Sequence, residues 1–128
     1  MSEKSVGRCP PRPDGHDKVT GKALYIDDLS KPGMWHGAAG RSAPASAAIL
    51  AIDIGAAAAA DREACVMIAA DLPGPHRLEV IADDWPILAE DVVRHVGEAV
   101  ALVAAPTRQR ARRAAAAVVV KYEERPAI

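Results

Sequence analysis

The chain contains no phenylalanine, and its aromatic residues are limited to two Trp and two Tyr among 128 residues. With so few aromatic rings, the sequence offers little surface on which the bases of a single-stranded nucleic acid could stack. A hydrophobic core therefore has to be built from Val, Ile, Leu and Ala. A chain of this length is expected to form one domain and to bury roughly two thirds of the surface of the unfolded chain.

An excess of charge of one sign is also lacking, because 16 Lys and Arg residues face 17 Asp and Glu residues. This balance excludes a broad basic surface of the kind that binds nucleic acid or acidic lipid. The apolar runs are interrupted by charged or turn residues before they reach the roughly 18–20 residues of a membrane span. We therefore expect neither a nucleic-acid partner nor a membrane partner.

Cysteine is scarce, with only Cys9 in the proline-rich start of the chain and Cys65 in an apolar run. This usage favours reduced thiols and a cytoplasmic protein over a disulfide. The polar first 18 residues lack the apolar core of a signal peptide, which agrees with a cytoplasmic location. Because Ala64 and Val66 flank Cys65, we interpret it as a small buried apolar residue and not as a nucleophile.

Prolines at positions 10, 11 and 13 predict an extended N-terminal arm over residues 1–17, followed by a domain over residues 18–128. Glycines at positions 37 and 40 indicate close approach of backbone within a strand. In the domain's first two thirds, turn residues separate short apolar runs, and we expect strands at 22–26, 34–43, 47–54, 65–70 and 78–82, a helix at 55–61 and a chain break at 83–86.

The segment VVRHVGEAVALVAAP, residues 92–106, predicts two strands joined at Gly97 and Glu98, where glycine can adopt a positive φ. Thr107 is the expected N-cap of a following helix. The helix has alanines and a valine at helical spacing on one face, which predicts that this face packs on a sheet: Ala111, Ala114, Ala115 and Val118. A last strand is expected at 118–124. This order of elements predicts an α+β fold with mixed sheets and two helices packed on one side.

Several polar residues are candidates for a functional site, and each has a simpler structural explanation. The acid pairs lie beside turns, the histidines lack metal-ligand spacing, and the glycines and serines fit no nucleotide-binding or hydrolase motif. The arginines of the last helix indicate a solvated face or a contact with a protein partner. These residues are Asp27, Asp28, Asp83, Asp84, His16, His36, His76, His95, Gly33, Gly37, Gly40, Ser42, Ser46, Arg108, Arg110, Arg112 and Arg113. We predict no catalytic, cofactor-binding or metal-binding residue in the chain.

Three blocks in a fixed order carry a resemblance: RPDGHDKVTGKALYIDDL, then GAAGRSAPASAAILAID, then IADDWPILAEDVVRHVGEAVALVAAPTRQRARRAAAAVVVKYEE. Together, from about residue 12 to residue 127, they resemble the α/β hammerhead domain, the N-terminal domain of the molybdenum-binding subunit of the xanthine dehydrogenase and aldehyde oxidase family. The chain departs from the family pattern at Ala43 and Ser46, where relatives commonly have proline and histidine, and in the compressed stretch 64–78.

The resemblance implies a part of a molybdenum hydroxylase that uses molybdopterin, iron–sulfur clusters and FAD. It implies that the residues holding the pterin and the catalytic glutamate lie in other domains, so that this chain is not active alone. Its partners would be the molybdopterin-binding domains or subunit of the same enzyme, together with iron–sulfur and FAD subunits. The chain would then be an excised domain, a truncated gene product or a separately encoded subunit.

We predict a structural and docking role, with Gly97 and Glu98 facing the partner. The alternative hypothesis is a free-standing protein-binding or small-molecule-binding module with the same fold. The docking hypothesis predicts an exposed apolar patch, whereas the alternative predicts a closed surface with a pocket of its own.

Overall fold

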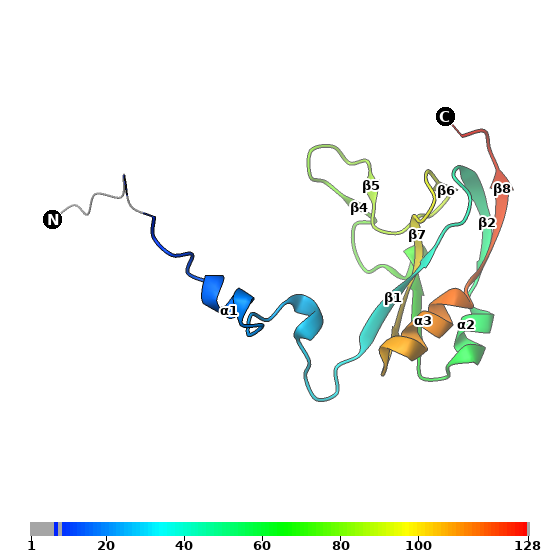
Figure 1. Cartoon of the computed structure of the whole chain (residues 1–128). Coiled ribbons are helices and arrows are strands. Elements are labelled where there is room, and N and C mark those ends of the chain that lie inside the picture. Colours follow the sequence, from blue (N-terminus) through cyan, green and yellow to red (C-terminus); the bar gives the residue numbers. More distant parts are fainter. Residues whose placement is uncertain (1–6, 8, 128) are drawn as a thin grey trace. The chain divides into compact units, whose positions relative to one another are not determined.

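The computed structural model describes Gly7 and residues 9–127 (Figure 1). The chain divides into two compact units, one that ends at Pro32 and one that begins at Gly33. None of the described helices is long and apolar enough to cross a membrane.

The first unit is ordered by local contacts. It contains the short helix α1 (Gly15–Val19) and the 3₁₀ turn η1 (Ile26–Asp28). The Thr20 hydroxyl donates to the His16 carbonyl at 2.7 Å, and the Asp28 carboxylate accepts from the Tyr25 backbone N–H at 3.0 Å. None of the described residues before Gly33 is buried.

Two expectations for this unit are wrong. The arm is helical from residue 15 and therefore not extended to residue 17, and the strand expected at residues 22–26 is irregular chain that leads into η1 at Ile26. The reason is local, because Gly21 turns the chain with a φ of +72° and Asp28 closes the backbone at Tyr25. The extended conformation expected for residues 1–6 and 8 lies outside the described residues.

The second unit is built on two three-stranded antiparallel sheets and one two-stranded ribbon. The first sheet has the order β1 (His36–Arg41), β7 (Ala99–Ala105), β3 (Cys65–Ile68). The second sheet has the order β6 (Val92–Val93), β2 (Ala47–Asp53), β8 (Val119–Glu124). The ribbon pairs β4 (Arg77–Leu78) with β5 (Trp85–Pro86).

Two helices, α2 (Gly55–Ala60) and α3 (Arg108–Ala116), complete the second unit, and a 3₁₀ turn η2 (Ala69–Asp71) follows β3. Helix α3 packs on β1 and β7, and α2 packs beside α3 and against β3 (Figure 1). Thr107 is the N-cap of α3, as expected, since its hydroxyl accepts from the Arg110 backbone N–H at 3.2 Å. The predicted α+β class with two helices on one side is confirmed.

Small residues let α3 approach the sheet closely. Ala111, Ala114 and Ala115 are buried on its inner face, as their spacing predicts. A Cβ atom at Gly40 would lie 3.4 Å from the Ala101 Cβ and 3.6 Å from the Ala115 carbonyl oxygen. The close approach expected at Gly40 is therefore present, whereas the one expected at Gly37 is not, because no atom lies within 4 Å of a Cβ built there.

The core includes two apolar clusters, one on the second sheet, to which Val100 of β7 also contributes, and one beneath α3. The cluster of the second sheet contains Ala47, Ala89, Val93 and Val100. The cluster beneath α3 contains Val103, Ala114 and Ala115. Aliphatic side chains and alanine thus form this core, as the lack of phenylalanine requires.

Strand lengths and partners differ from expectation in the second half of the chain. The strand predicted at residues 78–82 is reduced to the last residue of β4, and the break predicted at 83–86 contains β5. The segments around 92–96 and 99–105 do not form a hairpin, because β6 pairs with β2 while β7 pairs with β1 and β3. The chain leaves the second sheet at Arg94, whose backbone N–H donates to the Glu98 carboxylate and not to a strand.

Candidate partner-facing site

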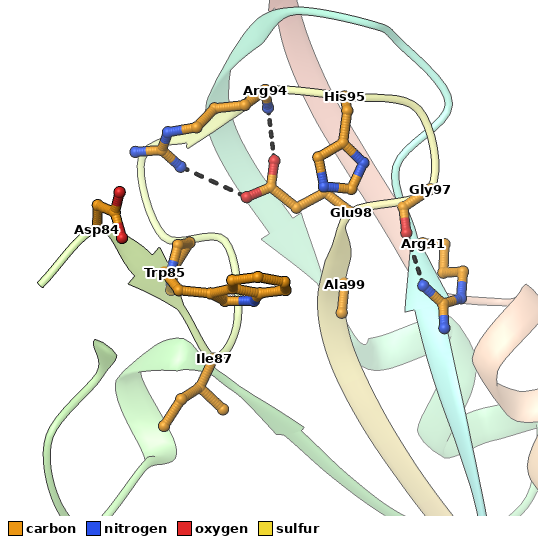
Figure 2. A pocket seen from close by; sticks show the side chains of 10 residues that line it. Arg41, Asp84, Trp85, Ile87, Arg94, His95, Gly97, Glu98 and Ala99 are labelled. Carbon is orange, nitrogen blue, oxygen red and sulfur yellow. Dashed lines mark hydrogen bonds and ion pairs between the residues drawn. The ribbon is translucent and has the colours of Figure 1, made fainter. Parts of the chain in front are cut away.

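A cavity of about 450 Å³ lies between the β4–β5 ribbon and the turn that contains Gly97 and Glu98 (Figure 2). The ribbon and the residues that follow it form one side, and the turn and the start of β7 form another. The lining residues are Arg41, Asp84, Trp85, Pro86, Ile87, Arg94, His95, Gly97, Glu98 and Ala99.

Glu98 is buried, with 8% of its surface exposed, and its carboxylate is used inside the chain. It accepts from the Arg94 backbone N–H at 2.5 Å and from the Arg94 guanidinium at 3.4 Å (Figure 2). These charge-assisted contacts stabilise a carboxylate that would be costly to bury alone. The Glu98 side chain therefore shapes the turn, and the surface of the turn is formed by its neighbours.

The end of β1 holds this turn from the other side. The Ser42 hydroxyl donates to the His95 carbonyl at 2.9 Å and accepts from the Glu98 backbone N–H at 3.1 Å. Two backbone hydrogen bonds of 2.9 Å join Ser42 to Gly97 and Glu98, and the Arg41 guanidinium donates to the Gly97 carbonyl at 2.7 Å. Because Ser42 is buried and its hydroxyl is satisfied, the turn is rigidly positioned.

The Gly97 backbone has the conformation that this turn requires. Its φ is +83°, in the left-handed region that favours glycine, as the sequence predicts. No atom lies within 4 Å of a Cβ built at Gly97, so the requirement is one of backbone conformation and not of space.

The wall opposite the turn is apolar. Figure 2 shows the Trp85 indole extending from β5 toward Ala99, with Ile87 below Trp85 in the view. Leu78 is the cross-strand partner of Trp85 in the ribbon, so the two side chains lie on the same ribbon face.

The other candidate residues from the sequence are dispersed. His76 is half-buried, with Nδ1 3.5 Å from a Glu90 oxygen, and His95 is exposed in the turn and not in a strand as expected. Cys65 is exposed, which corrects the expectation that it is buried. Among residues 7 and 9–127, no three or more His, Cys, Asp or Glu side chains are grouped so that they could hold a metal ion.

Two of the arginines of α3, Arg110 and Arg113, contact other parts of the chain and do not only form a solvated face. The Arg110 guanidinium contacts the carboxylates of Asp61 and Glu63, and Arg113 donates to the Ala60 carbonyl at 2.5 Å. The contact with Arg110 lowers the pKa of Asp61 from 3.8 to about 2, against the opposing effect of burial. These contacts join α3 to the end of α2, which corrects the interpretation of Arg110 and Arg113 as surface residues only.

Reasoning from the sequence missed Arg41, Ser42 and Trp85 as members of this site. The sequence suggests Ser42 only as a candidate nucleophile and Trp85 only as part of a chain break. The usable signal was that Arg41-Ser42 and Gly97-Glu98 both belong to the blocks that carried the resemblance, although nothing in either block indicates that they contact each other.

The fold and the turn define the class of the chain as an α+β domain of the hammerhead type. The chain belongs to the family "Aldehyde oxidase and xanthine dehydrogenase, a/b hammerhead domain", whose model matches residues 20–126.

Relatives and a solved structure agree with this assignment. The chain is 42% identical over 113 residues to a subunit of the probable xanthine dehydrogenase of Bacillus subtilis, covering 88% of this chain and 15% of the relative. It is 34% identical over 119 residues to the nicotinate dehydrogenase large molybdopterin subunit of Eubacterium barkeri, covering 93% of this chain and 28% of the relative. The structure of reconstituted CO dehydrogenase from Oligotropha carboxidovorans superposes with a TM-score of 0.84 at 35% identity, covering 94% of this chain and 15% of that one. The chain thus spans a small part of the length of the proteins that it matches.

Proposed function

We propose that the chain is a structural and docking domain of a molybdenum hydroxylase, without a catalytic residue of its own. The observation that carries this proposal is the family match over residues 20–126, together with relatives in which the matched segment is 15% or 28% of the whole. The whole enzyme would hydroxylate a purine, an N-heterocycle or an aldehyde, and it would act in the cytoplasm.

In this proposal the cofactors are held elsewhere in the enzyme. Molybdopterin, iron–sulfur clusters and FAD would be bound by partner domains or subunits, and molybdopterin would supply the centre at which the substrate is oxidised. The residues of this chain would bind and position the partner.

The same proposal assigns residues 18–128 to the domain and residues 1–17 to an arm that precedes it. The start of the family match at residue 20 supports this division. We place Gly97 and Glu98 at the partner-facing surface, Gly97 by its backbone and Glu98 by holding the shape of the turn. The buried Glu98 carboxylate and its contacts with Arg94 support that structural contribution.

A chimera tests the proposal. Residues 20–126 would replace the matching segment of the Eubacterium barkeri large molybdopterin subunit, and molybdopterin would be quantified in the purified chimera, in the unmodified subunit and in a subunit with the segment deleted. We expect the chimera, but not the deletion variant, to retain molybdopterin at the level of the unmodified subunit. A soluble chimera without molybdopterin would overturn the proposal.

The isolated chain provides the complementary measurement. We expect it to contain no molybdenum and to oxidise neither hypoxanthine nor an aldehyde. Turnover or tightly bound molybdenum in the isolated chain would contradict the docking role. Binding of a small molecule by a monomer with no apolar-dye binding would favour the free-standing module.

A further inference from the structure

The β4–β5 ribbon exposes more apolar surface than a two-stranded element can cover. Trp85 is 68% exposed and Leu78 48%, and at the tip of the ribbon Val80 is 80% and Ile81 100% exposed. The ribbon has two cross-strand pairs, Arg77 with Pro86 and Leu78 with Trp85. An isolated ribbon of this length is marginally stable, so contacts beyond the ribbon are needed to hold it.

These apolar side chains continue into the cavity beside the Gly97 turn. Trp85 and Ile87 line this cavity, so the apolar side of the ribbon reaches it. A contiguous apolar surface with polar residues around it is typical of a protein–protein contact. We refer to Leu78, Val80, Ile81, Trp85 and Ile87 as the ribbon surface.

The charges around the cavity are not equally compensated. Arg94 is paired with Glu98, whereas the Arg41 guanidinium donates to a neutral group, the Gly97 carbonyl. In Figure 2, Asp84 and Arg41 lie on opposite sides of the view. The Arg41 side of the cavity therefore presents a cation that an acidic group of a partner would complement.

We infer that the ribbon surface is the docking site for a segment of the molybdopterin-binding part of the same enzyme. The segment would present apolar side chains to Trp85 and Ile81 and a carboxylate to Arg41. The exposed apolar side chains indicate that the partner is a protein. The Arg41 guanidinium favours an acidic residue in the part of the partner that contacts it. This inference rests on the proposed function and names the surface through which that function is performed.

Hydrogen–deuterium exchange tests where the partner lies. Amide exchange over residues 77–87 would be compared between the isolated chain and the Eubacterium barkeri chimera described above. We expect exchange in the chimera to slow by about tenfold or more in this segment, because a docked ribbon opens less often. Protection confined to other segments in a chimera that retains molybdopterin would overturn the inference and leave the proposed function standing.

Substitutions provide a second measurement. In the chimera, Trp85→Ser and Ile81→Ser are each expected to lower either the amount of retained molybdopterin or the exchange protection of residues 77–87 by about tenfold. An effect of this size is expected when an exposed anchor residue of an interface is lost. Leu50→Ser is the matched control, since Leu50 is 64% exposed but lies on β2 of the second sheet. It is expected to change neither quantity.

Folding and charge are checked separately. The unfolding midpoints of the isolated Trp85→Ser and Leu50→Ser chains should agree, because both residues are exposed. Arg41→Gln, which keeps a donor for the Gly97 carbonyl, is expected to weaken protection less than Trp85→Ser does. Equal effects of Trp85→Ser and Leu50→Ser on the chimera would overturn the inference. A dimer of the isolated chain that protects residues 77–87 would do the same, since it would assign the ribbon surface to a second copy.

Discussion

At the scale of single residues, Gly97 sets the conformation of the turn that we propose faces the partner. Its φ of +83° strains any side chain that is branched at Cβ, although the space around it is open. We therefore expect Gly97→Val to lower the free energy of unfolding by about 1–3 kcal/mol, measured by urea denaturation. Gly97→Asn is the control and should cost less, because asparagine enters the left-handed region more readily. Equal stability of Gly97→Val and the unmodified chain would contradict the assigned role.

Asp61 makes the stability of the chain dependent on pH in acid. Its pKa is lowered from 3.8 to about 2 in the folded chain by the Arg110 guanidinium. A carboxylate whose pKa is lowered on folding contributes stability above its unfolded pKa and loses it as the pH falls through the folded pKa. We expect the stability difference between the unmodified chain and Asp61→Asn to be constant above about pH 4 and to shrink between about pH 4 and pH 2.

Urea denaturation at a series of pH values measures this difference. Asp84→Asn is measured alongside as the control, because Asp84 is an exposed acid at the edge of the cavity. A gap between the unmodified chain and Asp61→Asn that widens as the pH falls below about 4 would contradict the assignment of Arg110 as the partner of Asp61.

At the scale of the elements, the packing of α3 on β1 limits the size of the residue at position 40. A Cβ there would touch Ala101 and the Ala115 carbonyl at ordinary contact distance, so an added methyl group is tolerated. Valine would add two further methyl groups to a Cβ that already has Ala101, the Ala115 carbonyl and Val118 within 3.7 Å. We expect Gly40→Ala to change the free energy of unfolding little and Gly40→Val to lower it by about 1–3 kcal/mol. Thermal and urea unfolding of both variants check this, and a stable Gly40→Val chain would show that α3 lies farther from the sheet.

Elements specified by neighbouring residues were predictable from the sequence, and elements specified by distant partners were not. Helix α3 followed from the Thr107 cap and the spacing of Ala111, Ala114 and Ala115, all within nine residues. The two strands predicted on either side of Gly97 are present as a shortened β6 and as β7, but their partners were not predictable, because β-branched residues favour a strand without specifying its partner. Val92 and Val93 pair with Ala47 and Ala48, and that pairing spans more than forty residues of sequence.

In the candidate site, too, the locally determined features were predictable from the sequence and the long-range contacts were not. The positive φ of Gly97 follows from the residue type and its place between two apolar runs. The burial of Glu98 and its clamp by Ser42 depend on contacts across 56 residues, which no spacing within either segment indicates. Trp85 was assigned to a break because the acids and the proline beside it are turn residues, and its exposure beside the cavity is a consequence of tertiary structure.

At the scale of the whole molecule, the second unit contains the hydrophobic core, and the described residues of the first unit are not among its buried residues. Both core clusters consist of residues from 38 onward, and no described residue before Gly33 is buried. Apolar burial is the main source of folding free energy, so a segment without buried residues contributes little to it. We expect the free energy of unfolding of a chain that begins at Gly33 to lie within about 0.5 kcal/mol of that of the full chain.

Urea denaturation of the full and shortened chains measures this prediction, and Val100→Ala shows that the assay is sensitive. Val100 is fully buried in the cluster of the second sheet, and its truncation should cost about 1–3 kcal/mol in both chains. Equal costs in the two chains would mean that the core is complete without the first 32 residues. A shortened chain that loses more than about 1 kcal/mol would instead require residues 1–32 to stabilise the second unit, which would contradict a core made from the second unit alone.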